Sequence, residues 1–519
     1  MATVGIAHHK MFIDGRGVDS DTSYEIRHPA TEETVCTVAK GTVEHADQAV
    51  ESARRAFEAG DWAAMPGEER SRIMKAIADR LGSELEEFTD AEVSCNGATR
   101  RQAYGFHVGL AAPHFLHFAE LAESFAFETS MPRPAYPTLS VNRIRREPIG
   151  VCAAIVPWNF PLVLGIWKIA PALAAGNSVV VKVDEKTPLS LLRLAQVAHE
   201  CGVPEGVFNV ITGDGPEVGA WLASHPDVDK VAFTGSTAVG REIMRLASGT
   251  VKKVSLELGG KGPVLVLDDA DLTIAADGVL FGCMLYSGQI CESGTRVYVP
   301  ESIHDEFVAR LVDRASTIKI GDPGDLDTDM GPVISARQRD RILGYLESAR
   351  SEGATVALGG GIPQGVEFQR GYWIQPTVLT DVTNDMQVAR EEIFGPVLSV
   401  LRYSDVDEAI ELANDSMYGL TAGVWSTDYE RATEVGDRLR AGTIWINNWH
   451  MVDPSMPFGG YKQSGVGREL GPDALNEYTE AKHIHMDLTQ DRERHIFDIL
   501  LSEPPADRSS AGVEAEQSL

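Results

Sequence analysis

The sequence predicts an α/β protein with two parallel-sheet domains and a small β arm. Short apolar runs alternate with helix-like stretches from residue 151 to 258, and a second alternation follows from about 264 to 475. Apolar strands joined by helices form parallel sheets that are covered on both faces, so each alternation predicts one domain. Two further strand-like segments, 134–149 and 482–488, lie outside both alternations and predict a pairing arm.

Composition limits the possible partners. The chain has 519 residues with 46 basic and 76 acidic side chains, a formal charge of −30. A field of that sign repels phosphate groups, so we expect neither nucleic acid nor an anionic membrane as a partner. No apolar window reaches the length of a membrane span, and the N-terminus lacks the basic and apolar regions of a signal peptide, so we expect neither a membrane span nor a signal peptide. Six cysteines without a C-x-x-C pair predict free thiols and a cytoplasmic location.

The N-terminal region is predicted to form helical packing without evident chemistry. Residues 42–60 place apolar side chains at the i, i+3, i+4, i+7 spacing of an amphipathic helix. Thr42 is a suitable N-cap and Gly60 a suitable stop. A second helix is expected at about 67–82.

The first alternation predicts five strands and four helices. The strands are expected at 151–156, 178–183, 207–212, 230–233 and 253–258, and the helices near 162–175, 189–201, 216–224 and 237–247. In such sheets ligands bind beyond the carboxyl ends of the strands. Small residues at several of these ends suit the close approach of a nucleotide.

The second alternation predicts strands at 263–267, 295–300, 395–403, 421–426 and 443–447. It indicates a second α/β domain. The last stretch, 503–519, is rich in Pro, Ser, Ala and Glu, so we expect it to be disordered.

Three side chains could carry chemistry. Cys291 lies on a Gly-flanked loop before a strand, where a thiol can act as a nucleophile, although a single Cys taken alone is more often an inert buried thiol. Glu257 ends an apolar strand before a Gly-Gly turn, where burial would raise its pKa toward that of a general base, unless it forms a structural ion pair. Asn159, in PWNFP (157–161), is a rigidly held carboxamide suited to an oxyanion, or simply a turn residue.

Other segments suit a dinucleotide. FTGSTAVG (233–240) runs from a strand through Gly235 and Ser236 into a helix, the layout that places phosphate at a helix N-terminus. GDGPEVG (213–219) could add backbone contacts. Lys182 and Glu185 follow a strand and could hold a ribose, unless they form a surface ion pair. A carboxylate there opposes a 2′-phosphate and favours NAD over NADP.

These motifs occur together and in order, and the chain resembles the aldehyde dehydrogenase superfamily, nonphosphorylating and NAD-dependent. The matching motifs are PWNFP (157–161), VKVDEKTP (181–188), FTGSTAVG (233–240), LELGGK (256–261), GQIC (288–291), EEIFGPV (391–397) and PFGGYKQSGVGRELG (457–471). The resemblance implies a Rossmann-like NAD-binding domain (1–133 and 150–260), a catalytic domain (261–475) and oligomerisation strands (134–149 and 476–490).

The resemblance also implies roles for single residues. Cys291 would be the nucleophile and Glu257 the general base, while Asn159 and the Cys291 backbone amide would form the oxyanion hole. No metal is implied. The implied NAD-binding residues are Ile155, Trp158, Lys182, Glu185, Gly215, Gly219, Phe233, Gly235, Ser236, Leu258, Gln338, Arg341, Glu392 and Phe394. Arg468 and Glu480 would tie the cofactor cleft to a subunit interface.

The implied substrate tunnel consists of Phe160, Val163, Trp167, Leu285, Trp449 and Phe458, which suits a broad range of aliphatic or aromatic aldehydes. Trp167 and Trp449 also resemble the aromatic box of betaine and amino-aldehyde oxidisers, and Glu292 could favour a cationic substrate. Two further hypotheses are a CoA-acylating enzyme, which Glu257 argues against, and a non-catalytic structural paralogue. Glu292 and Ser293, directly after the nucleophile, depart from the family pattern and bear on the substrate class. The resemblance favours a homotetramer over a dimer.

Overall fold

The computed structural model describes residues 6–134 and 139–501. They fall into two units: a main unit, which runs to Phe125 and resumes over Pro148–Tyr478, and an arm, which comprises Ala126–Glu147 and the chain from Thr479 onward. The predicted disordered segment 503–519 lies outside the described residues.

Two large sheets organise the main unit and confirm the α/β prediction. The first has eight strands in the order β20-β12-β11-β8-β9-β10-β2-β3, and its five central strands are parallel. Its strands are β2 (Met11–Ile13), β3 (Arg16–Val18), β8 (Val151–Ile155), β9 (Ser178–Lys182), β10 (Phe208–Ile211), β11 (Lys230–Thr234), β12 (Lys253–Glu257) and β20 (Gly465–Val466).

The second sheet has seven strands in the order β15-β16-β17-β14-β13-β18-β19, parallel except for the edge strand β15. Its strands are β13 (Gly262–Val266), β14 (Gly294–Pro300), β15 (Thr355–Leu358), β16 (Thr377–Thr380), β17 (Val397–Tyr403), β18 (Thr421–Trp425) and β19 (Thr443–Ile446). The strands predicted in both alternations therefore exist, with ends that shift by one or two residues.

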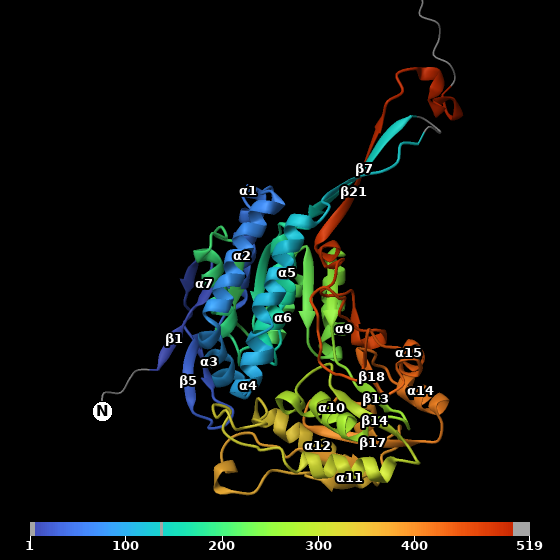
Figure 1. Ribbon diagram of the computed structural model, residues 1–519. Helices are drawn as coiled ribbons and strands as arrows, with labels where there is room; N and C mark the ends of the chain where they lie inside the picture. Colours follow the sequence, from blue (N-terminus) through green and yellow to red (C-terminus); the bar gives the residue numbers. More distant parts are fainter. Residues whose placement is uncertain (1–5, 135–138, 502–519) are drawn as a thin grey trace, which may run out of the picture. The chain divides into compact units, whose positions relative to one another are not determined.

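Helices surround the sheets, and α5 and α6 lie side by side near the first one (Figure 1). The α-helices are α1 (Val43–Ala59), α2 (Gly67–Ser83), α3 (Leu85–Asn96), α4 (Arg100–Gln102), α5 (Ala111–Ser124), α6 (Pro161–Ala175), α7 (Leu189–Glu200), α8 (Ala220–Ser224), α9 (Thr237–Ala247), α10 (Leu272–Met284), α11 (His304–Ala315), α12 (Ala336–Glu352), α13 (Gln387–Arg390), α14 (Val406–Asn414) and α15 (Tyr429–Asp437). Every residue of α6 is buried, which explains its nearly continuous apolar sequence.

The two helices predicted at the N-terminus exist as α1 and α2, but the strands that precede them were not predicted. Five strands precede α1: β1 (Ala7–His9), β2, β3, β4 (Ser23–Arg27) and β5 (Thr34–Ala39). β2 and β3 form a hairpin whose turn is Asp14-Gly15, with φ of 56° and 72°. Asp-Gly is the two-residue sequence that favours such a turn, so the signal was present in the sequence.

The predicted boundaries also need correction. Gly465–Val466 pair with β12 at the edge of the first sheet, although the prediction placed them in the second domain. The arm begins at Ala126 rather than 134, and its sheet has the order β21-β7-β6. These strands are β6 (Glu128–Ser130), β7 (Ser140–Pro148) and β21 (Thr479–Asp487).

Candidate active site

Two cavities of the main unit meet at Asn159 and Cys291, the two residues that line both. One cavity spans about 500 Å³, including space open to solvent, and is largely apolar. The other spans about 1540 Å³, again including space open to solvent, and lies beyond the carboxyl ends of β8 and β11. A thiol at the junction faces both spaces, so a molecule in either cavity can approach it.

The smaller cavity contains five of the six predicted tunnel residues. Phe160, Val163 and Trp167 come from α6 and the residue before it, Leu285 begins a short 3-10 helix, and Phe458 comes from a loop. Glu292, which the sequence analysis expected near the substrate, also lines this cavity, whereas sequence reasoning missed several other lining residues: Phe106, Leu110, Leu164, Ile290, His450 and Val452. Phe106 lies in a π-helical turn, Ala103–Val108, a local irregularity that propensity does not predict.

Trp449, the sixth predicted tunnel residue, does not line the cavity. Its side chain is almost fully buried, and its indole packs where side chains at Gly282, Gly294 and Gly423 would collide with it. The indole N–H donates to the carbonyl of Glu292 at 2.9 Å. Trp449 therefore supports the backbone beside the nucleophile, and the next residue, His450, reaches the cavity instead.

The larger cavity suits a dinucleotide. Eight predicted NAD-binding residues line it: Trp158, Gly235, Ser236, Leu258, Gln338, Arg341, Glu392 and Phe394. Ser236 caps the N-terminus of α9, where free backbone N–H groups favour a phosphate. Lys186, Thr234, Gly259, Ile334, Ser335 and Arg337 also line the cavity and were missed.

The segment Glu392–Phe394 is firmly positioned at this cavity. Gln338 donates to the Phe394 carbonyl at 2.7 Å, and Arg341 donates to the Glu392 carbonyl at 2.8 Å. The Glu392 carboxylate accepts the Gly260 N–H at 3.0 Å. Burial raises the pKa of Glu392 to about 7, with the Gly260 bond acting in the opposite direction.

Six predicted cofactor residues do not line this cavity: Ile155, Lys182, Glu185, Gly215, Gly219 and Phe233. Lys182 lies 4.0 Å from the Glu185 carboxylate, whose other oxygen is 2.5 Å from Lys186. The Phe233 ring packs over Gly235, where a Cβ would fall 2.4 Å from the ring. Phe233 thus explains why residue 235 is Gly.

The Cys291 thiol is held in an environment that opposes its ionisation. Burial raises its pKa well above the ordinary value, and the carboxylates of Glu292, Glu392 and Glu257 add to the effect. The thiol therefore needs a proton acceptor before it can act as a nucleophile.

Asn159 is 3% exposed, and its carboxamide donates one hydrogen bond, to the Gln289 carbonyl at 3.1 Å. A carboxamide carries two N–H donors, so one is left for an atom bound at the junction. The contact with Gln289 also ties Asn159 to the loop that carries Cys291.

Glu257 ends β12 and is 4% exposed, but it lines neither cavity at the junction. Burial raises its pKa well above the ordinary value, and the Glu469 carboxylate raises it further, whereas Lys168 and Arg468 lower it. Lys168 is fully buried in α6 and donates to Glu469 and to the Thr234 hydroxyl, each at 2.6 Å. A lysine inside an otherwise apolar helix was the signal for this network, and sequence reasoning missed it.

Glu292 and His450 form a buried pair on the wall of the apolar cavity. Nδ1 of His450 lies 2.8 Å from the Glu292 carboxylate. His450 is 3% exposed and Glu292 is 7% exposed. Nε2 of His450 has no hydrogen-bond partner among the described residues. The pair places charge or hydrogen-bonding capacity directly beside the nucleophile.

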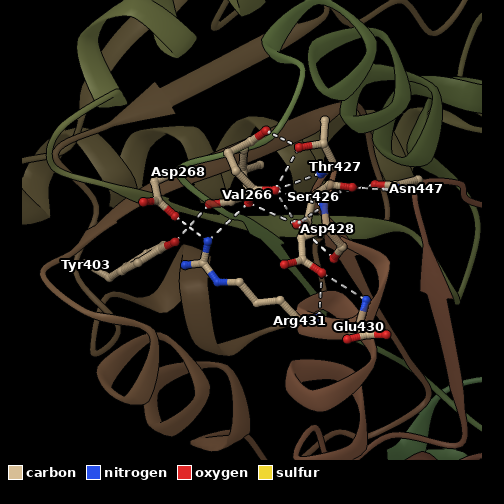
Figure 2. Close-up of polar contacts among 10 residues, drawn as sticks. Val266, Asp268, Tyr403, Ser426, Thr427, Asp428, Glu430, Arg431 and Asn447 are labelled. Atoms are coloured by element: carbon tan, nitrogen blue, oxygen red, sulfur yellow. Dashed lines mark hydrogen bonds and ion pairs between the residues drawn. The ribbon is translucent and has the colours of Figure 1, made fainter.

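Polar contacts anchor the loop that carries His450 (Figure 2). The Asn447 carboxamide accepts the Ser426 N–H at 2.9 Å and donates to the Ser426 carbonyl at 2.7 Å. The Ser426 hydroxyl in turn donates to Asp269 at 2.7 Å. Asn447 and His450 have φ of 55° and 60°, so these contacts hold a left-handed backbone at both ends of a short turn.

Within the described ranges, no group of three or more His, Cys, Asp or Glu side chains is arranged to hold a metal ion. In the same part of the chain, no helix combines the length and apolarity that crossing a membrane requires.

Comparison with known proteins gives consistent results. The sequence profile of the aldehyde dehydrogenase family matches residues 17–484. A betaine aldehyde dehydrogenase of Bacillus subtilis (strain 168) is 44% identical over 478 residues, which cover 92% of this chain and 96% of the relative. Aldehyde dehydrogenase 1A1 of Rattus norvegicus is 42% identical over 494 residues, covering 94% and 97%. The crystal structure of a Staphylococcus aureus betaine aldehyde dehydrogenase in complex with NAD+ superposes with a TM-score of 0.91 at 41% identity, covering 93% of this chain and 95% of that chain.

Proposed function

The chain belongs to the aldehyde dehydrogenase family, and we propose that its NAD-dependent oxidation of aldehydes to carboxylic acids takes place at Cys291. The observation that carries this assignment is the position of Cys291 and Asn159 at the junction of the two cavities. An aldehyde in the apolar cavity and NAD in the larger one would then share one reacting centre.

In the proposed mechanism, Cys291 loses its proton and adds to the aldehyde carbon. That proton passes to solvent, and the raised pKa of Glu257 makes its carboxylate a stronger base than an ordinary one for the later hydrolysis step. Negative charge develops on the former carbonyl oxygen, where the remaining Asn159 N–H donates; one such donor is typically worth ~3–4 kcal/mol in the transition state. Departure of hydride from this carbon leaves a thioester on Cys291. Glu257 then takes a proton from water, whose oxygen attacks the thioester and releases the acid.

NAD supplies the hydride acceptor when it is bound. The residues proposed to hold it are those that line the larger cavity: the start of α9 at Ser236 for the pyrophosphate, Glu392 for the nicotinamide ribose, and Phe394 with Trp158 for the ring. The rings of Phe394 and Trp158 pack edge to face with their centroids 5.3 Å apart, which gives that end of the cavity a fixed wall.

Two substitutions test these assignments. Cys291→Ala should abolish aldehyde-dependent NADH formation while NAD binding, followed by fluorescence quenching, stays within about twofold of the wild type. Glu257→Gln should release up to one NADH per active site in a burst, followed by little turnover, because the thioester persists. Normal steady-state turnover in either variant would contradict the role given to that residue.

A cationic aldehyde is a second candidate substrate, and Glu292 favours it. The carboxylate lies on a wall that also presents Trp167, and carboxylate and aromatic face both attract a quaternary ammonium group. The names of two relatives, both betaine aldehyde dehydrogenases, point the same way.

Two aldehydes of equal shape test this candidate. Betaine aldehyde and 3,3-dimethylbutanal differ only in the charge of the branched centre, so their ratio of kcat/KM isolates electrostatics. If the substrate is cationic, the wild type prefers betaine aldehyde and Glu292→Gln lowers that preference about tenfold, equivalent to ~1.4 kcal/mol. If Glu292→Gln leaves the ratio unchanged, Glu292 does not select a cationic aldehyde, and an apolar aldehyde remains the proposed substrate. Ser293→Ala, at a neighbouring buried position, is the matched control.

We also propose a cytoplasmic homotetramer. All six cysteines are free thiols, which suits a reducing compartment.

A further inference from the structure

A third cavity, with room for about one water-sized molecule, lies beside the turn that joins β12 to β13. Its wall presents the cationic side chains of Lys261, Arg296 and Arg440, and none of its lining residues is acidic. In a chain with a formal charge of −30, a cavity whose charged lining side chains are all positive is unexpected.

Two of these cations are buried without a carboxylate in ion-pair contact among the described residues, although Glu392 and Glu391 act on the Lys261 charge from farther away and raise its pKa. Lys261 is 2% exposed, and its Nζ has no hydrogen-bond partner among the described residues. Arg296 is 1% exposed, and its guanidinium donates only to neutral oxygens: the carbonyl of Lys261 at 3.1 Å, the hydroxyl of Tyr298 at 2.9 Å, and the carbonyls of Ala413 and Leu412 at 3.0 and 3.4 Å. Buried charges normally have a partner of opposite sign, because removing them from water is costly.

We propose that this cavity binds a small inorganic anion of halide size, which accepts a hydrogen bond from the Lys261 ammonium and compensates the charge of Arg296. A single water molecule would give Lys261 a hydrogen bond but no negative charge. The competing arrangement is a water beside a neutral Lys261 amine, because burial and Arg296 lower the pKa of Lys261 to about 7.

The position of the cavity links it to the NAD site. Lys261 directly follows Gly260, whose N–H donates to Glu392, and the Lys261 charge acts on that carboxylate. Anion binding at Lys261 does not depend on the roles proposed for Cys291 and Glu257, so either proposal can fail while the other holds.

Bromide is a suitable probe because it scatters anomalously. Crystals of the full-length protein, grown at pH 6.5 and soaked in sodium bromide, should show an anomalous peak within hydrogen-bond distance of Lys261 Nζ. In solution at the same pH, bromide at about ten times its dissociation constant should raise the unfolding midpoint by about 1–2 °C relative to fluoride at equal ionic strength.

Lys261→Met should lose this bromide response. Lys252→Met is the matched control, since it removes the same charge from a lysine that donates to the His225 carbonyl elsewhere in the main unit. A Lys252→Met response equal to that of the wild type supports the proposal. An equal response in Lys261→Met, or a water peak without anomalous signal in the wild-type cavity, would overturn it. If Lys261→Met does not fold, the diffraction experiment on the wild type decides.

Discussion

At the scale of the residue, the site depends on side chains and backbone held in unfavourable states. Tyr286 and Ser287, shortly before Cys291, have φ of 48° and 54°, a left-handed conformation that is costly for residues other than Gly. The Tyr286 hydroxyl donates to the Asn96 carbonyl and the Ser287 hydroxyl to the Gly331 carbonyl, so packing on both sides holds the loop. These contacts therefore preorganise the loop that carries the Cys291 thiol.

The raised pKa of Glu392 predicts a pH dependence for NAD binding. Only the ionised carboxylate is a strong acceptor for ribose hydroxyls, and with a pKa of about 7 it becomes ionised as the pH rises from 6 to 8. The dissociation constant for NAD should therefore fall as the pH rises through 7. Titration by isothermal calorimetry at pH 6, 7 and 8 measures this trend. Glu392→Gln should bind more weakly and show a flat profile, and an unchanged slope in that variant would assign the dependence to another group.

At the scale of the element, one aspartate connects the ends of three strands to the loop that carries His450, which we call the substrate loop. Asp269 follows β13 and accepts hydrogen bonds from Ser426, Thr427 and Asp428 after β18. Ser426 in turn bonds to Asn447 after β19 (Figure 2). These hydrogen bonds hold the pKa of Asp269 down at about 2, against the effect of its partial burial. The loop that presents His450 is thus fixed from outside the cavity.

Asp269→Ala should destabilise the protein and loosen the substrate loop. It leaves several donors unpaired, so the free energy of unfolding should fall by about 2–4 kcal/mol. KM for the aldehyde should rise more than kcat falls, because His450 and Val452 shift while Cys291 does not.

Asp268→Ala is the matched control at the neighbouring position. Asp268 is 58% exposed and forms an ion pair with Arg431 at 2.7 Å, so its loss should cost less than about 1 kcal/mol and leave KM unchanged. Thermal unfolding and steady-state kinetics of both variants make the comparison. Equal effects of the two substitutions would contradict the role given to Asp269.

At the scale of the whole molecule, the arm is a sheet that exposes much of its surface. Every residue of β6 is exposed, and most of β21 is exposed as well. Exposed apolar side chains such as Met486 and Leu488 are the kind of surface that we expect the proposed assembly to cover.

Replacing both Met486 and Leu488 with Asp should therefore reduce the size of the assembly. Light scattering of the wild type should give about four times the chain mass of 56.2 kDa, and the double variant should give a smaller multiple. Val366→Asp, which changes an apolar residue of the main unit that is 79% exposed, should leave the mass unchanged. A wild-type monomer, or an unchanged mass in the double variant, would contradict an assembly through the arm.

The sequence by itself determined the two strand–helix alternations, the arm and the candidate side chains Cys291, Asn159 and Glu257. These features are local: apolar periodicity marks an element, and a Gly-flanked Cys or a Pro-bounded Asn marks a loop within a few residues. The Asp-Gly turn of the N-terminal hairpin was equally local, and its strands could have been predicted.

Only the tertiary structure decided the arrangements that join distant segments. Lys168 and Glu469 are 301 residues apart, and β20 pairs in the first sheet although every strand of the second sheet precedes it in the sequence. The choice between Trp449 and His450 as a cavity residue depended on three glycines from three elements, Gly282, Gly294 and Gly423, which leave room for the indole in the core. No local pattern encodes such choices, because which of two adjacent side chains faces a cavity is set by the volume that other parts of the chain leave open.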